Sequence, residues 1–396
     1  MAALISLVLI AMAGLLCIPV VILLVEVVAA QRLPRERPFV QGKKGRVAVI
    51  IPAHNESSGI VPTISDILPQ LGESDRLIVV ADNCSDDTAA VSERAGAKVI
   101  VRNDLGRIGK GYALGWAIDH IKDDPPDFVV FIDADCRVQS DAIARLSDVC
   151  DSLQRPVQAC FLMHSPDNSP INHGLAEFAF LLRNLVRPLG LKNLNLPVQL
   201  MGTGMAFPWD LIRSAPLASG HLVEDLKLGL DLAEMGKAPY FYPDVKVTSA
   251  FPVTAKGTDS QRQRWVQGHL GMILKGVPRL LLRSVARRNL DLLALTLDLL
   301  VPPLSLLGLL VVAMFVVTSI AALLGPSAIG LWIAAVNIAL FTAAIFLAWA
   351  RFGRDVLPGR VFLSIGPLVL RRIRLYGGLL LGRTASHWIR TDRGDR

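Results

Sequence analysis

The chain has 396 residues, of which 52% are hydrophobic and only 19% are charged. Soluble domains carry about 25% charged residues, so part of the apolar sequence is expected to face lipid. This composition excludes disordered, fibrous and small disulfide-rich classes. The five cysteines are odd in number and have no C-x-x-C spacing, which is typical of a reducing compartment and argues against a zinc ribbon. We therefore expect a globular domain joined to membrane segments.

Basic residues are concentrated beside the apolar stretches. The net charge is +7, from 41 Lys and Arg against 34 Asp and Glu. Positive clusters lie at 31–46, at 275–288 and from Arg351 to the end of the chain. Basic clusters next to apolar segments mark the cytoplasmic side of a membrane. We therefore expect membrane lipids, and not nucleic acid, as partners of these clusters.

Three uncharged runs are long enough to cross a bilayer, at 2–25, 299–324 and 329–350. By the positive-inside rule the first helix starts outside, the later two form a hairpin, and the basic segments lie inside. Pro302 and Pro303 fall within the second run, where a membrane helix tolerates them as a kink.

The hydropathy and charge pattern divides the chain into five parts. No span is expected to hold a buried charge, because Glu26 and Asp298 fall at helix ends, and this argues against a transporter. Apolar stretches interrupted by arginines predict an interfacial helix at 353–390. The expected parts are an N-terminal transmembrane helix (1–30), a basic linker (31–45), a cytoplasmic domain (46–280), two transmembrane helices (297–351) and a basic C-terminal segment (352–396).

Short apolar runs alternate with helical patterns in the cytoplasmic part. This order predicts a Rossmann-like α/β domain with a doubly wound, mostly parallel sheet. Ligands bind such sheets outside the carboxyl ends of the strands. Strands are predicted at 47–51, 77–81, 98–102 and 128–132, and helices at 60–71, between 87 and 96, and at 112–121.

The loops after three predicted strands read P-A-H-N-E-S, A-D-N-C-S-D-D-T and D-A-D-C. None contains G-x-G-x-x-G, so a nicotinamide- or flavin-dependent dehydrogenase is not expected. Asp133 and Asp135 are two residues apart at the end of a strand, so both side chains project to the same side. Two such carboxylates suit a hard divalent cation that also binds substrate phosphates.

Two further segments have two interpretations each. The glycine-rich loop at 106–111 either holds a phosphate, through backbone N–H groups and Lys110, or is a flexible surface loop. Glu224 and Asp225 open a predicted helix, where they either stabilise its first turn or supply a general base.

A later helical stretch carries an amide, a guanidinium and an indole on one face, from Gln261, Arg264 and Trp265. These groups could clamp a pyrophosphate and a sugar ring, with arginine forming bidentate hydrogen bonds. The same pattern is also typical of a solvated or interfacial helix.

The order of these motifs resembles the membrane-bound family 2 glycosyltransferases, which include cellulose, hyaluronan and poly-N-acetylglucosamine synthases and their bacterial exopolysaccharide relatives. The motifs are P-A-H-N-E, D-N-C-S-D-D-T, D-A-D, G-T-G-M, E-D and Q-x-x-R-W, within about 47–270. V-E-D replaces the usual T-E-D, which removes a hydroxyl and keeps the acids. The resemblance implies a GT-A type nucleotide-sugar-binding domain. This domain is expected on the cytoplasmic side of the plasma (bacterial inner) membrane.

The resemblance also implies roles for individual residues. Asp225, with Glu224 beside it, matches the catalytic base, and Asp133 and Asp135 match the motif that binds Mg²⁺ or Mn²⁺. The nucleotide-sugar site would comprise Pro52, His54, Glu56, Asp82, Lys110, Asp133, Gln261 and Arg264. The acceptor site would comprise Gly202, Thr203, Gly204 and Trp265.

The implied activity is inverting transfer of a sugar from a UDP-sugar to a growing polysaccharide or lipid-linked oligosaccharide, in exopolysaccharide or cell-surface glycan synthesis. Assembly or export proteins are expected partners, because larger synthases build a translocation channel from more than three spans. The alternative is transfer of one sugar to ceramide, diacylglycerol or polyprenyl phosphate. The Q-x-x-R-W motif argues against polyprenyl phosphate, because polyprenyl-phosphate sugar synthases generally lack it. An inactive nucleotide-binding protein is also open, although both acids of D-A-D and the E-D pair are present.

Overall fold

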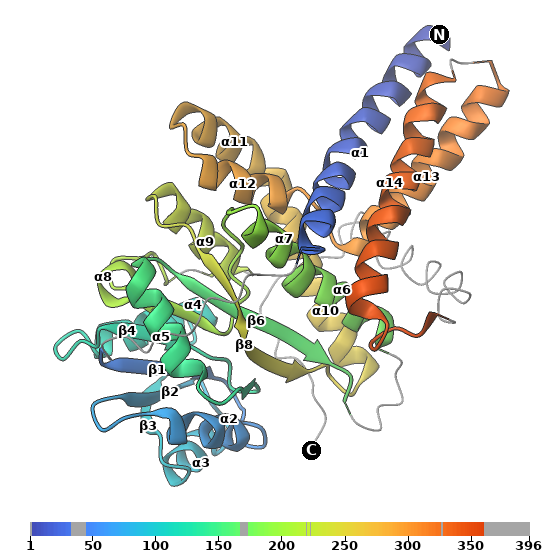
Figure 1. Ribbon diagram of the computed structural model, residues 1–396. Helices are drawn as coiled ribbons and strands as arrows, with labels where there is room; N and C mark the ends of the chain where they lie inside the picture. The colour runs from blue at the N-terminus through green and yellow to red at the C-terminus, as the bar shows by residue number, and fades with distance from the viewer. Residues whose placement is uncertain are drawn as a thin grey trace.

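The structure, a computed structural model, describes residues 2–32, 45–166, 173–218, 220–221, 223–325 and 328–359. Within this part of the chain, a sheet domain lies at one end and a bundle of three long helices at the other (Figure 1). Most of the expected basic linker (31–45) and of the expected interfacial helix (353–390) lies outside the described residues.

The core of the domain is an eight-stranded sheet of the described residues, in the order β3-β2-β1-β4-β7-β6-β8-β5. β3, β2, β1 and β4 pair in parallel, as predicted. β7 runs antiparallel to both β4 and β6, and β5 runs antiparallel to β8, so the second half of the sheet is mixed. The strands are β1 (Val47–Ala53), β2 (Arg76–Asp82), β3 (Lys98–Arg102), β4 (Phe128–Phe131), β5 (Arg137–Val138), β6 (Val157–His164), β7 (Met205–Pro208) and β8 (Tyr240–Ala250).

Helices cover both faces of the parallel half of the sheet. On β1, Val49 and Ile51 pack into the core on the side of α2 and α5, whereas Ala48 and Ile50 pack on the side of α4 and α9. Burial on both faces explains why the strand sequence is a continuous apolar run and not an alternating one. The helices of the domain are α2 (Ile60–Ile67), α3 (Thr88–Arg94), α4 (Lys110–His120), α5 (Ala142–Leu153), α8 (Trp209–Ile212) and α9 (Glu224–Glu234).

Two predicted helices have different bounds. The helix expected over 60–71 ends at Ile67 and continues as a 3-10 turn, Leu68–Gln70. Pro69 has no N–H to donate to the carbonyl group four residues earlier, so the α-helical hydrogen bonding stops there, although Leu68 keeps an α conformation. The helix expected from residue 112 begins at Lys110, which brings the lysine into its first turn.

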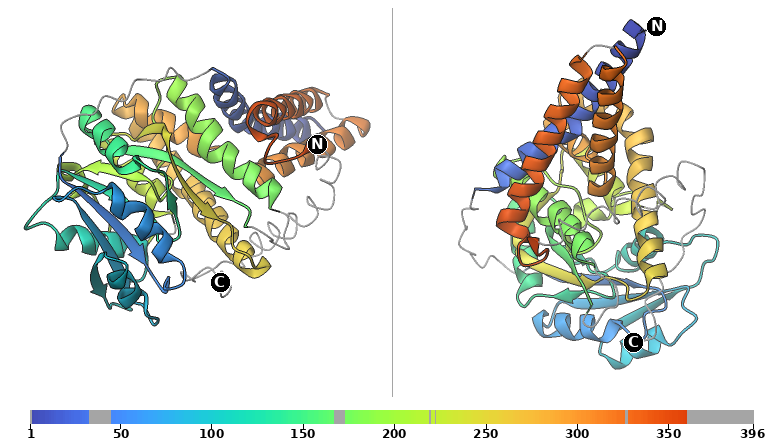
Figure 2. Two further views of the ribbon diagram at one scale, coloured as in Figure 1. Left: turned by 60° about the horizontal axis from the view of Figure 1, so that its bottom comes forward. Right: turned by 90° about the vertical axis from the view of Figure 1, so that its right-hand side faces the viewer.

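Three of the described helices are long and apolar enough to cross a membrane, over Ala3–Ala30, Leu304–Leu323 and Ile329–Gly353. This confirms the three predicted apolar helices, one N-terminal and two C-terminal, that could span a membrane. They lie side by side and extend away from the sheet domain (Figures 1 and 2). The helices are α1 (Ala2–Ala30), α13 (Leu304–Leu323) and α14 (Ile329–Ala348), the last of which continues as a π-helical turn, Trp349–Gly353.

Pro302 and Pro303 separate two helices and do not kink a single one, so that expectation is wrong. α12 (Leu290–Leu299) ends before them, and α13 begins at Leu304. Neither proline can continue α12, because proline has no N–H and its ring clashes with the carbonyl group four residues earlier. α12 instead forms a hairpin with α11 (Val277–Ala286), so the second membrane helix is shorter than the apolar run.

Three helices join the sheet domain to the membrane bundle. α6 (Gly174–Leu181) leads through a π-helical turn, Leu182–Val186, into α7 (Arg187–Asn193). α10 (Ala255–Gly271) lies near them, between the sheet and the foot of the bundle (Figure 1). π-helical turns within helices are often found at functional sites.

The side chain of Arg187 connects three helices, α7, α1 and α12. Its Nε donates to Glu26 Oε2 of α1 at 2.6 Å, and its Nη2 donates to Asp298 Oδ1 of α12 at 2.5 Å. All three side chains are buried, and Glu26 lies within the first membrane helix, so the expectation of no buried charge in a span is wrong. The opposite charge of Arg187 makes that burial tolerable.

Gly190 allows α7 to approach α1 at backbone distance. A β-carbon at this position would lie 1.9 Å from the backbone oxygen of Glu26, so no other residue fits. The close approach keeps the guanidinium of Arg187 within reach of the carboxylate of Glu26.

We expect replacement of Arg187 by alanine to destabilise the protein by about 3–5 kcal/mol, because two buried carboxylates lose their counter-charge. The free energy of unfolding, measured by chemical denaturation of the full chain in detergent, checks this. Arg213→Ala is the control, because that side chain is 59% exposed and its ion pair with Asp210 lies on the surface; it should cost no more than about 0.5 kcal/mol. Equal losses in the two variants would contradict a buried ionic connection.

Candidate functional site

A cleft of about 690 Å³ lies at the carboxyl ends of β1, β2 and β4 and extends to α10. It is formed by loops after the strands and by the first turns of α4 and α9, where parallel sheets present their ligand sites. Of the residues predicted for the site, those that line the cleft are Pro52, His54, Glu56, Asp82, Lys110, Asp133, Asp135, Gly202, Glu224, Asp225, Gln261, Arg264 and Trp265.

Asp133 and Asp135 follow β4 with the buried Ala134 between them, so both face the cleft. Asp133 forms an ion pair with Lys110, and its backbone N–H donates to the hydroxyl of Thr203 at 3.0 Å. Asp135 accepts a hydrogen bond from Ser249 Oγ at 2.6 Å. Among the described residues no group of three His, Cys, Asp or Glu could hold a metal ion. The two carboxylates therefore fit a Mg²⁺ or Mn²⁺ ion that takes its other ligands from phosphate and water.

Lys110 lies in the first turn of α4 and reaches across the cleft. Its Nζ donates to the backbone oxygen of Gly202 at 2.8 Å, in addition to its ion pair with Asp133. Burial lowers the pKa of Lys110, but the charges of Asp133, Glu224 and Asp225 outweigh burial and leave the pKa raised. The lysine therefore stays protonated, paired with Asp133 and within electrostatic reach of Glu224 and Asp225.

Glu224 and Asp225 occupy the first turn of α9, with their carboxyl groups at the cleft. Burial raises the pKa of both groups, and the charge of Asp225 raises that of Glu224 further. A β-carbon on Gly202 would lie 3.4 Å from Asp225 Oδ2 and 3.6 Å from Lys110 Nζ, so both charged groups converge on this glycine. A carboxyl group with a raised pKa in a cleft is a candidate general base.

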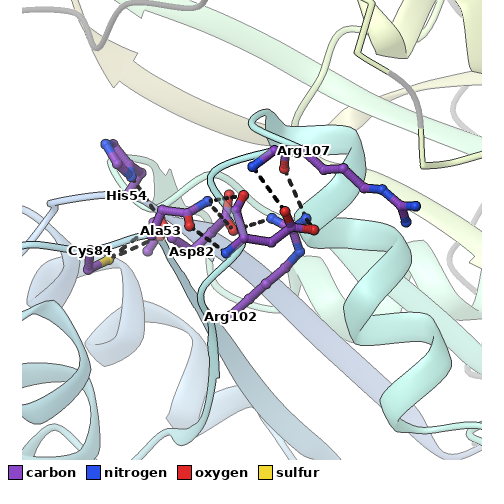
Figure 3. Close-up of polar contacts among 9 residues, drawn as sticks. Ala53, His54, Asp82, Cys84, Arg102 and Arg107 are labelled. Atoms are coloured by element: carbon purple, nitrogen blue, oxygen red, sulfur yellow. Dashed lines mark hydrogen bonds and ion pairs between the residues drawn. The ribbon is translucent and has the colours of Figure 1, made fainter.

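Asp82, the last residue of β2, is buried beside Arg102 (Figure 3). Arg102 Nη1 donates to Asp82 Oδ1 at 2.6 Å, and Asn83 Nδ2 donates to the same oxygen at 3.1 Å. Burial raises the pKa of Asp82, although Arg102 opposes the shift. His54 Nδ1 lies 2.7 Å from the backbone oxygen of Asp82, which connects the first two loops of the site.

α10 presents Gln261, Arg264 and Trp265 to the cleft, as their shared helical face predicted. The ring of Trp265 lies 5.8 Å from that of Phe180 on α6, so the indole is packed on one side. The solvated-face interpretation does not fit, because Gln261 is buried and Trp265 packs against the core of the domain.

Two predicted residues lie beneath the cleft and do not line it. The side chain of Thr203 is fully buried, and its hydroxyl accepts from the backbone N–H of Asp133. Gly204 has a φ of +65°, and its N–H donates to the backbone oxygen of Phe131 at 2.9 Å. Both residues support the loop that carries Gly202.

Several residues in the cleft or beside it were not predicted from the sequence. Arg102 ends β3, and its guanidinium also lies 5.8 Å from the ring centre of Tyr112, which lines the cleft. Arg183 and Asn184 enter the cleft from the π-helical turn. A signal for Arg183 was available, since two arginines four residues apart, at 183 and 187, are unusual in an apolar helix.

Residues 45–268, more than half of the chain, match the family described as glycosyltransferase-like family 2. An uncharacterised glycosyltransferase of Rickettsia conorii is 28% identical over 123 residues, which are 31% of this chain and 36% of that protein. An uncharacterised glycosyltransferase of Rickettsia felis matches with the same identity over the same shares. The chain thus spans about a third of the length of these curated relatives.

Among solved structures, the mannosyltransferase PcManGT from Pyrobaculum calidifontis, determined with GDP-mannose and Mn²⁺, is similar over 87% of this chain and 99% of its own. The TM-score is 0.53 and the sequence identity is 18%. At this identity the likeness concerns the fold, and with the family match it confirms the predicted GT-A architecture.

The buried loop under the cleft leads to a stability prediction. Gly204→Ala is expected to lower the free energy of unfolding by about 2–4 kcal/mol. The added β-carbon would lie 2.9 Å from the β-carbon of Ala159, and the positive φ at this position is unfavourable for alanine. Gly236→Ala is the matched control, because its φ is +74° and nothing lies within 4 Å of the added carbon. In Gly236→Ala the free energy of unfolding should fall by only about 1 kcal/mol. Similar midpoints of chemical denaturation for the two variants would contradict the tight packing at Gly204.

Proposed function

The chain belongs to the glycosyltransferase-like family 2, and we propose that it transfers a sugar, with inversion, from a nucleotide sugar to an acceptor hydroxyl. The acceptor is a growing polysaccharide or a lipid-linked oligosaccharide, and the reaction takes place at the cytoplasmic face of the bacterial inner membrane. The observation that carries the proposal is the convergence of Lys110 and Asp225 on Gly202, with Asp133 bound to Lys110 in the same cleft.

The donor is proposed to be a UDP-sugar. Asp82 ends the second strand at the position that matches the nucleotide-contacting acid of the family, and its buried pairing with Arg102 fixes the carboxylate at the cleft wall. The GDP-mannose and Mn²⁺ in the mannosyltransferase of the same fold support a nucleotide sugar and a divalent cation as a class. The nucleobase and the sugar of the donor are identified by the donor test described below.

Asp135 and Asp133 would hold Mg²⁺ or Mn²⁺. When bound, this ion neutralises charge on the leaving diphosphate. The protein adds two cations of its own at the cleft, the ammonium of Lys110 and the guanidinium of Arg264. Fixed positive charge where negative charge develops lowers the barrier of such a transfer.

Asp225 is proposed to act as the general base. It accepts the proton of the acceptor hydroxyl while the acceptor oxygen forms a bond to the anomeric carbon, and the bond from that carbon to the diphosphate oxygen breaks. The nucleoside diphosphate leaves with the bonding electrons. A single displacement of this kind gives a β-linked product from an α-linked donor.

The first test is donor turnover by the full chain in nanodiscs of bacterial polar lipids. We expect nucleoside diphosphate release with one donor among UDP-glucose, UDP-N-acetylglucosamine, UDP-galactose, UDP-glucuronate and GDP-mannose, and loss of release with EDTA. Asp225→Asn should lower the rate at least about 100-fold, because a general base contributes that much or more. Asp210→Asn, whose side chain is 87% exposed, should leave the rate unchanged. Near-normal turnover by a folded Asp225→Asn variant would contradict the assignment.

The pH dependence of transfer gives a second test. Asp225 must be deprotonated to accept a proton, and burial raises its pKa, so the rate should fall on the acidic side at a pH above the ordinary range of an aspartate. Lys110 lowers the pKa of Asp225, so Lys110→Met should move this acidic limb to higher pH, whatever its effect on the maximal rate. Profiles of kcat against pH measure the pH at which the rate falls on the acidic side. The same pH in Lys110→Met and in the unchanged protein would contradict the effect of Lys110 on the pKa of Asp225.

A further inference from the structure

A second cavity, of about 190 Å³, lies on the membrane side of the cleft. It is bounded by α1, α6, α10 and the segment at 301–305 that opens α13. We call it the junction groove. Leu23 belongs to the first membrane helix and Leu304 to the second, so the groove reaches the foot of the membrane bundle.

The junction groove adjoins the catalytic cleft. Four residues line both cavities: Phe180, Arg183, Gln261 and Trp265. These side chains form the boundary between the two cavities, so a molecule with one end in the cleft and the other beside the membrane helices would pass them.

The groove combines an apolar lining with positive charge. None of its lining residues within the described chain is acidic, and most are aliphatic or aromatic. His269 is buried there, and its Nε2 donates to the backbone oxygen of Leu299 at 3.1 Å. Burial together with Arg183 and Arg187 lowers the pKa of His269 to about 3, so the imidazole is uncharged. Arg187 is neutralised by Glu26 and Asp298.

Arg183 differs from Arg187, although it lies one turn earlier in the same helical segment. It forms no hydrogen bond and no ion pair within the described part of the chain. Burial lowers its pKa and the charge of Asp225 opposes the shift, which puts the guanidinium within electrostatic reach of the proposed base. Because Arg183 has no partner within the described residues and lies between the two cavities, its guanidinium is placed to bind an anion, and phosphate is the anion whose geometry it matches.

We propose that the junction groove binds the lipid chain of a phosphate-linked acceptor and that Arg183 binds its phosphate at the boundary between groove and cleft. The saccharide end of this acceptor then extends into the cleft toward Asp225. The inference rests on the proposed function and narrows it, because it selects a lipid-linked acceptor over a free polysaccharide. Three features support a lipid phosphate as the occupant: the foot of the membrane helices, the absence of acids from the lining, and the continuity with the cleft.

The test uses the full chain in phosphatidylcholine nanodiscs and two photoreactive probes, a diazirine analogue of farnesyl phosphate and the same analogue of farnesol. The phosphate probe should label α6, α10 or residues 301–305, and farnesyl phosphate should compete more strongly than farnesol or inorganic phosphate. Arg183→Gln should reduce labelling by the phosphate probe about tenfold or more, and leave labelling by the alcohol probe unchanged.

Two further variants separate the groove from general effects. Ala179→Phe places a large side chain in the groove and should reduce labelling by both probes. Arg213→Gln removes an exposed arginine and should change neither. Thermal unfolding of each variant shows that it is folded.

Equal labelling by the two probes, labelling outside the groove, or a folded Arg183→Gln variant that labels normally would overturn the proposal. An increase in the donor KM of Arg183→Gln with unchanged labelling would also overturn it, because Arg183 would then serve the donor diphosphate. If only the lipid site is wrong, the groove is not labelled and Asp225-dependent transfer persists. Failure of the proposed function would instead appear as labelling without any Asp225-dependent transfer.

Discussion

The buried guanidinium of Arg187 is the interaction on which the arrangement of this protein depends. It binds Glu26 of the first membrane helix and Asp298 of the helix that precedes the second, so one side chain joins segments more than 250 residues apart in the sequence. The two buried carboxylates are tolerated because both pair with Arg187, and loss of Arg187 would leave them without a counter-charge. Gly190 makes this pairing possible, because only a residue without a side chain lets α7 lie against α1.

The same contact also fixes one side of the proposed active site. Arg183, one turn before Arg187, is held by that anchored helix at the boundary between the catalytic cleft and the junction groove. On the other side of the cleft, α10 contributes Gln261 and Trp265 to both cavities. The helices that attach the sheet domain to the membrane bundle would therefore also form the acceptor side of the proposed site. Donor and acceptor are proposed to approach Gly202 from opposite directions, the donor from the strand ends and the acceptor from the membrane.

The sequence was sufficient for the parts of this molecule that depend on local pattern. Continuous apolar runs predicted β1 to β4 as parallel strands, and the topology of such sheets then placed Asp82, Asp133 and Asp135 at one edge. The family is confirmed, whereas the likeness to cellulose and hyaluronan synthases in particular stays a prediction. The antiparallel pairing of β7, the ion pair of Asp82 with Arg102, and the burial of Glu26 were not predicted. Each depends on which distant segments pack together, and a single charged residue looks the same in the sequence whether its partner is water or another side chain.

We propose a single displacement at the anomeric carbon, in which Asp225 takes the proton of the acceptor hydroxyl and the diphosphate leaves from the opposite face of that carbon. The anomeric configuration of the product, measured by proton NMR on the material made from an α-linked nucleotide sugar, tests it most directly. A β-linked product is the result that this arrangement requires. An α-linked product would mean that the donor reacts with retention, and the opposed placement of base and leaving group would then be wrong.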